Sequence, residues 1–513
     1  MALRGILFIL AFLVSAVGVR ALPVVLRILL GGISISICSL FIQKIHPLCC
    51  FIVCKEREHY TNIFMELMEL DTLPPAFLEQ MRDLLGEKGV QSYLYCMEGP
   101  PYRGIRINPL KCTRDRLESC LPFRLEPAPF SPLEFYLPPS VLRPGRLPPY
   151  HAGAFYVQEP SASSAVTALD PKPGEKILDL CAAPGGKSTQ IAGLLGGEGL
   201  LWANDVNYGR TAALISNLER MGTRNAVVSC CRPEKLCSAL AGFFDRVLVD
   251  APCSEEGMFR RSPEAVRAWS PAQVKACAAR QEALLYSALK AVRKGGILEY
   301  STCTFSPEED EGVVSRVLRQ RKDFEPICLS LPFGRPARIK GARRIYPMDG
   351  GEGHFLAVLR RTSPNPCEVS PRRPGPEPDS STEKAISDIF RNLPKGRLEV
   401  VRGCCCLLPD GLPELSGLGV LRAGIPIGRR KKGHFLPEHA AFAASNPEDL
   451  RAVLSLQSGS PSLSAFLRGE EIPAGHLPTG YAGVAADGMM TGFGKCSGGF
   501  LKNHYPKGLR NHF

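Results

Sequence analysis

Two cysteines of this chain stand in short motifs where a nucleophile could act. Cys253 ends the run Asp250–Cys253, DAPC, and Cys303 lies in the run Tyr300–Thr304, YSTCT. Each motif follows a short apolar run, as expected at the carboxyl end of a buried strand. A cysteine thiolate can add to C6 of a cytosine and make C5 nucleophilic toward a methyl donor, provided that the thiol pKa is lowered locally. The motifs therefore predict a crevice with two thiols, although a buried structural cysteine is the commoner role for either residue alone.

A glycine-rich turn earlier in the chain is typical of a ligand-binding loop. Residues Lys176–Lys187 read KILDLCAAPGGK, which is a short apolar run, a turn, and the start of a helical pattern. A strand, a Gly-rich turn and a helix present backbone N–H groups at the carboxyl edge of an α/β sheet. Asp205 ends the next apolar run, where an acid commonly accepts hydrogen bonds from a ribose; helix capping is the alternative role.

Strand and helix patterns alternate over residues 170–360 and predict how these motifs are positioned. The expected strands are Ile177–Leu180, Gly199–Ala203, Ala226–Ser229, Arg246–Val249 and Gly296–Tyr300. The clearest helical patterns are Gly209–Met221 and Ala272–Val292. This alternation predicts a doubly wound, mainly parallel α/β sheet. Ligands of such sheets bind at the carboxyl ends of the strands, where all the motifs fall, and Lys187 would add positive potential beside the thiols.

The first residues of the chain differ in composition from the rest. Apolar runs cover residues 5–19, 22–26 and 28–42. Each run is shorter than the ~20 residues that a spanning helix needs, although together they would serve. The leader is therefore a membrane segment or an upstream extension ahead of a start at Met65 or Met68. We favour the extension, because the sequence from Met65 onward is typical of a cytosolic protein.

The net charge and the cysteine content are compatible with an intracellular protein that binds nucleic acid. The formal net charge is +12, and the 20 cysteines are scattered, with no two of them three residues apart. This spacing provides neither a CxxC zinc pair nor a disulfide framework, so we expect no metal and a reducing compartment.

Basic residues with interleaved aromatic residues stand in both flanking regions. The strand-like stretch Tyr102–Asn108 predicts Arg103 and Arg106 as exposed cations. Near the end of the chain stand Lys495, Lys502, Lys507 and Arg510 among Phe493, Phe500 and Tyr505. This pattern suits phosphate contact and base stacking, and a solvated basic face is the alternative.

Several motifs together resemble one known family. CAAPGGK, DAPCS-x-x-G-MFR and YSTCTFSPEE-x-E are similar to the Nol–Nop–Sun family of RNA 5-methylcytosine methyltransferases. LPPAFLEQMRDLLG, PPYRGIRIN, GAFYVQEPSA, GGEGHFLAVLRR and LKNHYPKGLR resemble its bacterial ribosomal-RNA subgroup. The resemblance implies a Rossmann-like core dependent on S-adenosyl-L-methionine, with α+β RNA-binding domains at both ends. It also implies a cytoplasmic monomer that methylates RNA, with small-subunit (16S) ribosomal RNA as the preferred substrate.

The resemblance also implies a role for each motif residue. Cys303 would be the nucleophile at C6, Cys253 would assist product release, and Asp250 would lie between donor and cytosine, with Lys187 beside them. The implied donor-binding residues are Cys181, Ala182, Ala183, Pro184, Gly185, Gly186, Lys187, Asp205, Arg210 and Asp250. The expected divisions are a leader (1–64), an N-terminal RNA-binding region (65–160), the methyltransferase domain (161–361), a Pro-rich linker (362–383) and a PUA-like RNA-binding domain (384–513).

Two residues depart from the family pattern. Arg232 stands where an acid usually contacts the adenine of the donor, and Glu234 is a nearby substitute. Glu255 stands where a glycine usually follows Pro-Cys-Ser, and glutamate adopts a positive φ less readily than glycine. These departures motivate a non-catalytic ribosome assembly factor as an alternative function. Transfer RNA is the alternative substrate, and attachment to a membrane depends on residues 1–54 alone.

Overall fold

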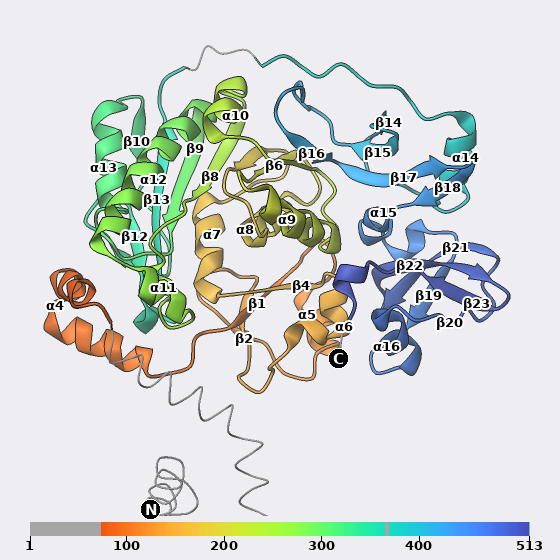
Figure 1. Ribbon diagram of the computed structural model, residues 1–513, viewed down its shortest axis with the longest axis horizontal. Coiled ribbons are helices and arrows are strands. Elements are labelled where there is room, and N and C mark those ends of the chain that lie inside the picture. Colours follow the sequence, from red (N-terminus) through yellow and green to blue (C-terminus); the bar gives the residue numbers. More distant parts are fainter. Residues whose placement is uncertain (1–72, 365–368, 512–513) are drawn as a thin grey trace, which may run out of the picture. The chain divides into compact units, whose positions relative to one another are not determined.

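The computed structural model describes residues 73–364 and 369–511 (Figure 1). The apolar leader therefore lies outside the described residues. Within the described ranges, no helix combines the length and the apolar character needed to cross a membrane.

A parallel sheet forms the centre of the fold, as the alternating pattern predicted. Its parallel strands are β5 (Lys176–Asp179), β6 (Leu200–Asn204), β7 (Ala226–Ser229), β8 (Phe244–Asp250) and β9 (Val292–Thr302). They lie in the order β9-β8-β5-β6-β7, so the chain winds outward in both directions from β5. The predicted doubly wound, Rossmann-like fold class is confirmed.

Helices cover both faces of this sheet and bury its apolar residues. On one face lie α10 (Pro233–Ala239), α12 (Pro271–Ala291) and α13 (Glu311–Gln320), which contribute Leu236, Leu285 and Val313 to one core cluster. On the other face lie α7 (Ser164–Leu169), α8 (Gly186–Leu195) and α9 (Tyr208–Arg220), which contribute Val166, Ile191 and Leu214 to a second cluster. Strands buried on both faces read as continuous apolar runs, which explains why the sequence revealed them.

Antiparallel strands extend the sheet at both edges. Next to β9 lies β13 (His354–Arg361), followed by β12 (Arg343–Ile345) and β11 (Arg335–Pro336), and β10 (Phe324–Pro326) also pairs with β13. At the opposite edge, β16 (Val420–Ala423) pairs with β7. β16 comes from the stretch predicted as the C-terminal domain, so this edge of the central sheet is completed by a distant part of the chain.

The N-terminal region contains one long helix and a small sheet. The helix is α4 (Pro75–Met97), which is broken at Gly86, where φ is +70°. The sheet has the order β2 (Glu126–Pro127), β3 (Glu134–Tyr136), β1 (Gly104–Ile107), β4 (Phe155–Gln158). The short helices are α5 (Arg114–Ser119), α6 (Pro148–His151), η2 (Pro144–Arg146) and η3 (Pro160–Ser163). The predicted exposure of Arg106 is wrong, since it is 1% exposed, and Arg103 is only partly exposed.

The C-terminal part contains two further sheets. One has the order β14 (Arg397–Val401), β15 (Cys404–Leu408), β17 (Ile425–Lys431), β18 (His434–Pro437). The other has the order β19 (Val453–Leu456), β21 (Gly480–Ala486), β22 (Met489–Ser497), β23 (Phe500–Asn503), β20 (Ile472–Pro473). The helices of this part are α14 (Ser380–Ser387), α15 (His439–Ala443), α16 (Pro461–Arg468), η6 (Pro447–Asp449) and η7 (Lys507–Leu509).

The predicted stacking surface at the end of the chain is only partly present. Phe493 and Tyr505 are buried, whereas Phe500 is 51% exposed. Strand alternation places Phe493 on the inner face of β22, and Tyr505 packs against Phe466 with ring centroids 5.5 Å apart. Of these three aromatic residues, Phe500 alone has a free face for a base.

Candidate active site

The predicted chemical residues meet at the carboxyl edge of the central sheet. The loops after β5, β6 and β9 contribute Ala183, Asp205 and Cys303 respectively, and Asp250 is the last residue of β8. Parallel strands end at the same edge, so residues far apart in sequence converge there. Direct contacts between these segments join them into one site.

The glycine-rich loop is held by the acid that follows β6. The Ala183 N–H donates to Asp205 Oδ2 (3.2 Å), and Arg210 Nη2 donates to the Ala183 carbonyl oxygen (2.5 Å). Asp205 Oδ1 accepts from the N–H of Asn207 (2.8 Å), and it is Asn207, not Asp205, that caps α9. Helix capping therefore does not explain why an acid stands at position 205.

The start of α8 suits the anionic end of a bound donor. Its N-cap is Gly185, with φ +111°, and no side chain among the described residues caps this terminus. The first N–H groups of a helix lack partners inside the helix and favour a negative charge. The carboxylate of an S-adenosylmethionine molecule matches these N–H groups, and its ribose hydroxyls match the carboxylate of Asp205. The residues present therefore fit this donor.

Lys187 and Asp250 form a shielded ion pair at the centre of the site. Lys187 Nζ lies 2.8 Å from Asp250 Oδ2. Burial by itself would lower the pKa of Lys187, but the adjacent Asp250 carboxylate reverses the effect and the pKa is raised. Lys187 therefore keeps its positive charge at neutral pH. Ser301 Oγ donates to Asp250 Oδ1 (3.3 Å) and orients that carboxylate from β9.

Two buried carboxyl groups near this ion pair were not predicted from the sequence. Burial raises the pKa of Asp179 to about 7 and that of Glu299 well above its usual value. Ser188 Oγ donates to Asp179 Oδ2 (2.6 Å), whereas neither carboxyl oxygen of Glu299 has a hydrogen-bond partner among the described residues. Burial without a hydrogen-bond partner therefore favours the neutral form of Glu299. The signal in the sequence was an acid inside an apolar strand run.

The two predicted cysteines face each other. Cys253 Sγ lies 3.3 Å from Cys303 Sγ. The hydrogen bond to Cys303, together with burial, raises the pKa of Cys253 well above the usual value. Cys253 therefore retains its proton and can donate it to a thiolate at Cys303. Attraction to Cys303 also contributes to the raised pKa of Lys187, so the ammonium group lies within electrostatic reach of Cys303.

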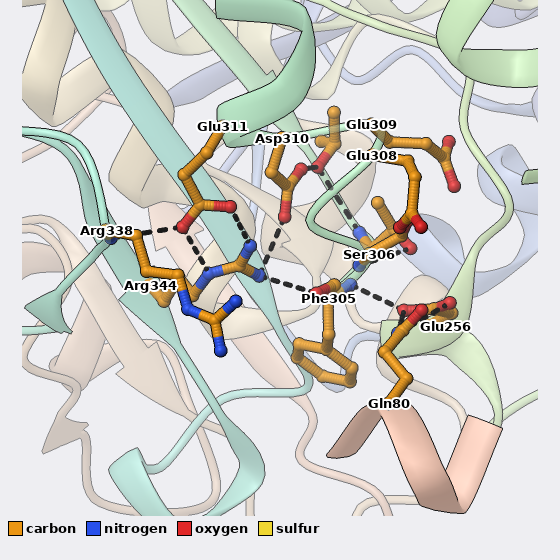
Figure 2. Close-up of polar contacts among 12 residues, drawn as sticks. Gln80, Glu256, Phe305, Ser306, Glu308, Glu309, Asp310, Glu311, Arg338 and Arg344 are labelled. Carbon is orange, nitrogen blue, oxygen red and sulfur yellow. Dashed lines mark hydrogen bonds and ion pairs between the residues drawn. The ribbon is translucent and has the colours of Figure 1, made fainter. Parts of the chain in front are cut away.

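The backbone beside Cys303 is held on both sides by buried side chains. Glu256 Oε2 accepts from the Phe305 N–H (2.8 Å), and Arg344 Nη1 donates to the Phe305 carbonyl oxygen (2.8 Å) (Figure 2). The Gly257 N–H donates to the carbonyl oxygen of Cys303 itself (2.8 Å). Arg344 is in turn paired with Asp310 and Glu311. We call Glu256, Arg344 and their contacts to Phe305 the Phe305 clamp.

The loop of Cys253 is tied to the same segment. The Ser254 N–H donates to Glu309 Oε2 (3.1 Å), and the hydroxyl groups of Ser254 and Thr304 are 2.8 Å apart. Gln281 Nε2 from α12 also donates to Glu309 Oε2 (2.7 Å). These contacts hold the two sulfur atoms together. The run SPEEDEG after Cys303 was the signal in the sequence, but its partners could not be deduced from it.

The two residues that depart from the family pattern have different settings. Glu255 is exposed and has φ +61° and ψ +31°, so the position has the left-handed conformation that glycine would adopt without strain. Arg232 and Glu234 are exposed at the start of α10. No group of three or more His, Cys, Asp or Glu side chains in the described ranges is placed to hold a metal ion.

The doubly wound sheet and the loops at its carboxyl edge place the protein among the Rossmann-like, S-adenosylmethionine-dependent methyltransferases. More narrowly, the chain belongs to the 16S rRNA methyltransferase RsmB/F family, whose model matches residues 166–360. Three flanking matches agree: the N-terminal domain of 16S rRNA methyltransferase RsmF (73–160), the RsmF rRNA methyltransferase first C-terminal domain (384–445) and the methyltransferase RsmF PUA domain (454–511).

Individual relatives support this membership. Ribosomal RNA small subunit methyltransferase F of Escherichia coli strain SE11 is 31% identical over 468 residues, which cover 85% of this chain and 96% of the relative. The protein of the same name from Erwinia tasmaniensis is 30% identical over 472 residues, with the same two shares. The crystal structure of a methyltransferase homolog protein from Pyrococcus horikoshii is 30% identical, has a TM-score of 0.51, and is matched over 58% of this chain and 97% of its own. The predicted family and donor class are confirmed.

Proposed function

We propose that this protein transfers a methyl group from S-adenosylmethionine to C5 of a cytosine in small-subunit ribosomal RNA, through a covalent bond between Cys303 and C6. The observation that carries this proposal is the 3.3 Å separation of the Cys253 and Cys303 sulfur atoms beside the Lys187–Asp250 pair. A lone buried thiol would be structural, but two thiols beside an ammonium group suit nucleophilic addition and its reversal.

The residues divide the reaction between addition and release. Cys303, as a thiolate, adds to C6, and the electron pair displaced from the C5–C6 bond makes C5 nucleophilic. The bound donor supplies a methyl group carried on a positively charged sulfur, and this methyl group becomes bonded to C5. The C5 proton then passes to water with the assistance of Cys253, the electron pair of that C–H bond restores the C5–C6 double bond, and Cys303 departs as a thiolate. Asp250 lies between donor and cytosine, and Lys187 holds its carboxylate.

The RNA is held by the parts of the chain outside the central sheet. The target base has to leave its stack to reach the sulfur atoms, at a cost of about a few kcal/mol. Phosphate contacts by exposed cations such as Lys495, Lys502 and Lys507 compensate that cost. Ribosomal RNA is favoured over transfer RNA because the relatives matched over 96% of their length are named as small-subunit ribosomal RNA methyltransferases. We place the enzyme in the cytoplasm, acting as a monomer.

Two cysteine substitutions test the assignment of roles. Cys303→Ala should abolish methyl transfer, because no thiolate is left to add to C6. Cys253→Ala should instead accumulate a protein–RNA adduct, which appears as a slower band on a denaturing gel. If Cys303→Ala accumulated the adduct and Cys253→Ala turned over normally, the two roles would be reversed.

The RNA substrate can be identified separately. Bisulfite sequencing of total RNA from cells with and without the gene should show one or more protected cytosines in 16S RNA that depend on the gene. A lost signal in transfer RNA would replace the proposed substrate with the alternative. Unchanged signals in all RNA, combined with donor-independent RNA binding, would favour the assembly factor.

A further inference from the structure

A buried arginine of the N-terminal region reaches the donor-binding loop. Arg106 lies on β1, outside the central sheet, and is 1% exposed. Its Nη2 donates to Thr189 Oγ1 in the first turn of α8 (2.7 Å), and its Nη1 donates to Gln158 Oε1 on β4 (2.5 Å). The guanidinium also lies over the ring of Tyr156, 5.2 Å from its centroid. The side chain that the sequence predicted as an exposed cation is thus an internal link between two parts of the chain.

The link continues from Thr189 into the backbone of the loop. Thr189 Oγ1 accepts from Arg106 and shares its own proton between the carbonyl oxygens of Gly185 (2.8 Å) and Gly186 (3.0 Å). Gly185 is the N-cap of α8, at the point where the donor's carboxylate is expected to bind. Consecutive hydrogen bonds polarise one another, so the charge on Arg106 strengthens the bond that Thr189 makes to Gly185.

The surroundings of Gly186 show how closely β4 packs on the same turn. A Cβ atom at Gly186 would lie 3.4 Å from Tyr156 Cε1 and 3.5 Å from Gln158 Oε1. These are the same two residues of β4 that contact Arg106. The start of α8 is therefore packed against the N-terminal sheet directly, and Arg106 supplies the polar part of that contact.

Burying the charged guanidinium of Arg106 costs free energy, which indicates that this side chain has a positioning role. Burial lowers the pKa of Arg106 to about 10, so the guanidinium is still charged at neutral pH. Glu134 offsets the burial by attraction and is itself held by Gln158 Nε2, which donates to its Oε2 (2.8 Å). A neutral apolar residue would fill this space without the desolvation penalty, so a charged group here has to be explained by what it positions.

We propose that Arg106 is a positioning residue for the methyl donor, which orders the Gly185–Thr189 turn through its bond to Thr189. This inference rests on the proposed donor site. Its consequence is that affinity for the donor depends on the N-terminal region, although the described residues of that region contribute no strand to the central sheet. Loss of the link should weaken donor binding about tenfold, as expected for one charge-assisted hydrogen bond. It should leave kcat at saturating donor within about twofold of the wild type, because Arg106 contacts neither sulfur atom.

Arg220 provides a matched control. It is 2% exposed, and its Nη1 donates to the carbonyl oxygens of Tyr150 (2.8 Å) and Phe155 (3.2 Å). It therefore also joins the N-terminal region to a helix of the central domain, α9, but its hydrogen bonds within the described residues do not go to the Gly185–Thr189 turn. Its Nη2 also donates to Asn217 Oδ1 (3.3 Å), whose Nδ2 donates to the Pro184 carbonyl oxygen (3.0 Å), so its link to the donor loop is indirect. Arg220→Gln should lower stability to an extent comparable to Arg106→Gln and raise the donor Kd much less than Arg106→Gln does.

The test measures donor binding by the full-length protein without catalysis. Calorimetric titration with S-adenosylmethionine gives Kd for the wild type, Arg106→Gln, Thr189→Val, the double variant and Arg220→Gln. We expect a Kd about tenfold higher for Arg106→Gln and for Thr189→Val, and no further loss in the double variant, because both changes remove the same link. Amide hydrogen exchange should become faster in residues 185–190 of these variants and not in Arg220→Gln.

Each opposite outcome is decisive. Unchanged donor affinity in Arg106→Gln, an equal loss in Arg220→Gln, or additive losses in the double variant would overturn the positioning role. If Arg106→Gln does not fold, Thr189→Val tests the link from its other end. A wild-type protein that binds no S-adenosylmethionine would overturn the donor site as well, so the two failures are distinguishable.

Discussion

Replacing Glu256 by glutamine tests whether the Phe305 clamp sets the position of Cys303, the proposed nucleophile. The carboxylate is 1% exposed and accepts from three groups that come from separate parts of the chain. Gln80 Nε2 lies 3.1 and 3.0 Å from Oε1 and Oε2, and the Phe305 nitrogen lies 2.8 Å from Oε2 (Figure 2). Trp269 Nε1 lies 2.9 Å from Oε1. A glutamine keeps the shape of this side chain but has one oxygen and one NH₂ group.

The geometry ensures that the glutamine loses one of these contacts. The amide of Gln80 can flip and accept from the new NH₂ group, but Trp269 and Phe305 present only N–H donors. Whichever way the substituted side chain is oriented, one of these two donors faces the NH₂ group and loses its acceptor. A lost hydrogen bond to a charged group costs about 1.5–3 kcal/mol, and an unpaired buried donor costs about 1–3 kcal/mol more. We therefore expect the variant to be about 3–5 kcal/mol less stable.

The effect on catalysis follows from the neighbouring bonds. Phe305 is close to Cys303 in the chain, and a misplacement of about 1 Å at a reacting group can reduce the rate about 100-fold. Single-turnover methyl transfer, measured at a temperature where the variant is folded, should therefore slow by one to two orders of magnitude. Urea unfolding of the same samples gives the stability.

Glu308 provides the control for this experiment. Glu308 lies in the same loop as Phe305 and is exposed. Its one side-chain hydrogen bond among the described residues is accepted from Ser306 Oγ (3.0 Å). Glu308→Gln should change stability by less than about 0.5 kcal/mol and leave the rate unchanged. A Glu256→Gln variant as stable and as fast as Glu308→Gln would refute the role of the clamp.

Three further changes have expected outcomes. Glu255→Gly relieves the left-handed conformation at φ +61° and should raise the free energy of unfolding by about 1 kcal/mol, measured by urea unfolding; an unchanged or lower value would contradict the strain. Asp179 has a pKa raised to about 7, so the folded state holds a proton that the unfolded state releases at lower pH, and this part of the stability is lost as pH rises. Between about pH 5 and 6.5, the free energy of unfolding of Asp179→Asn should therefore fall less steeply with rising pH than that of the wild type, by about 1.4 kcal/mol per pH unit. Parallel curves of unfolding free energy against pH would contradict the raised pKa of Asp179. Gly353→Ala places a Cβ 2.5 Å from the Phe305 ring and should abolish methylation while donor binding persists. Normal turnover would show that the backbone around residue 353 can shift to accommodate the methyl group.

The central sheet could be predicted from the sequence because its signals are local. Each parallel strand is a short apolar run followed by a turn or a helix pattern, and the expected strands match β5 to β9, most closely at Ala226–Ser229. The chemical motifs follow those strands, so their convergence at one edge follows from the topology.

The error at Arg106 has a definite physical cause. Alternation along β1 predicts which residues share a face, but not whether that face meets solvent or another domain. In the structure this face packs against α8, and the cation finds partners at Thr189 and Gln158. The partners of Glu256 and the pairing of β16 with β7 are equally non-local, since they join segments separated by long stretches of chain.

Pairing of β16 with β7 has a consequence for how the protein is made. During synthesis, β5 to β9 leave the ribosome long before Val420–Ala423, so β7 is an open edge with unpaired N–H and C=O groups until then. The Ala226 carbonyl oxygen later accepts from the Gly424 N–H, and the Cys230 N–H later donates to the Gly419 carbonyl oxygen. The methyltransferase domain therefore cannot finish folding as a nascent chain until the C-terminal part has emerged as far as β16 and Gly424. A chain cut in the Pro-rich linker would keep every residue of the active site and yet expose a strand edge that invites aggregation.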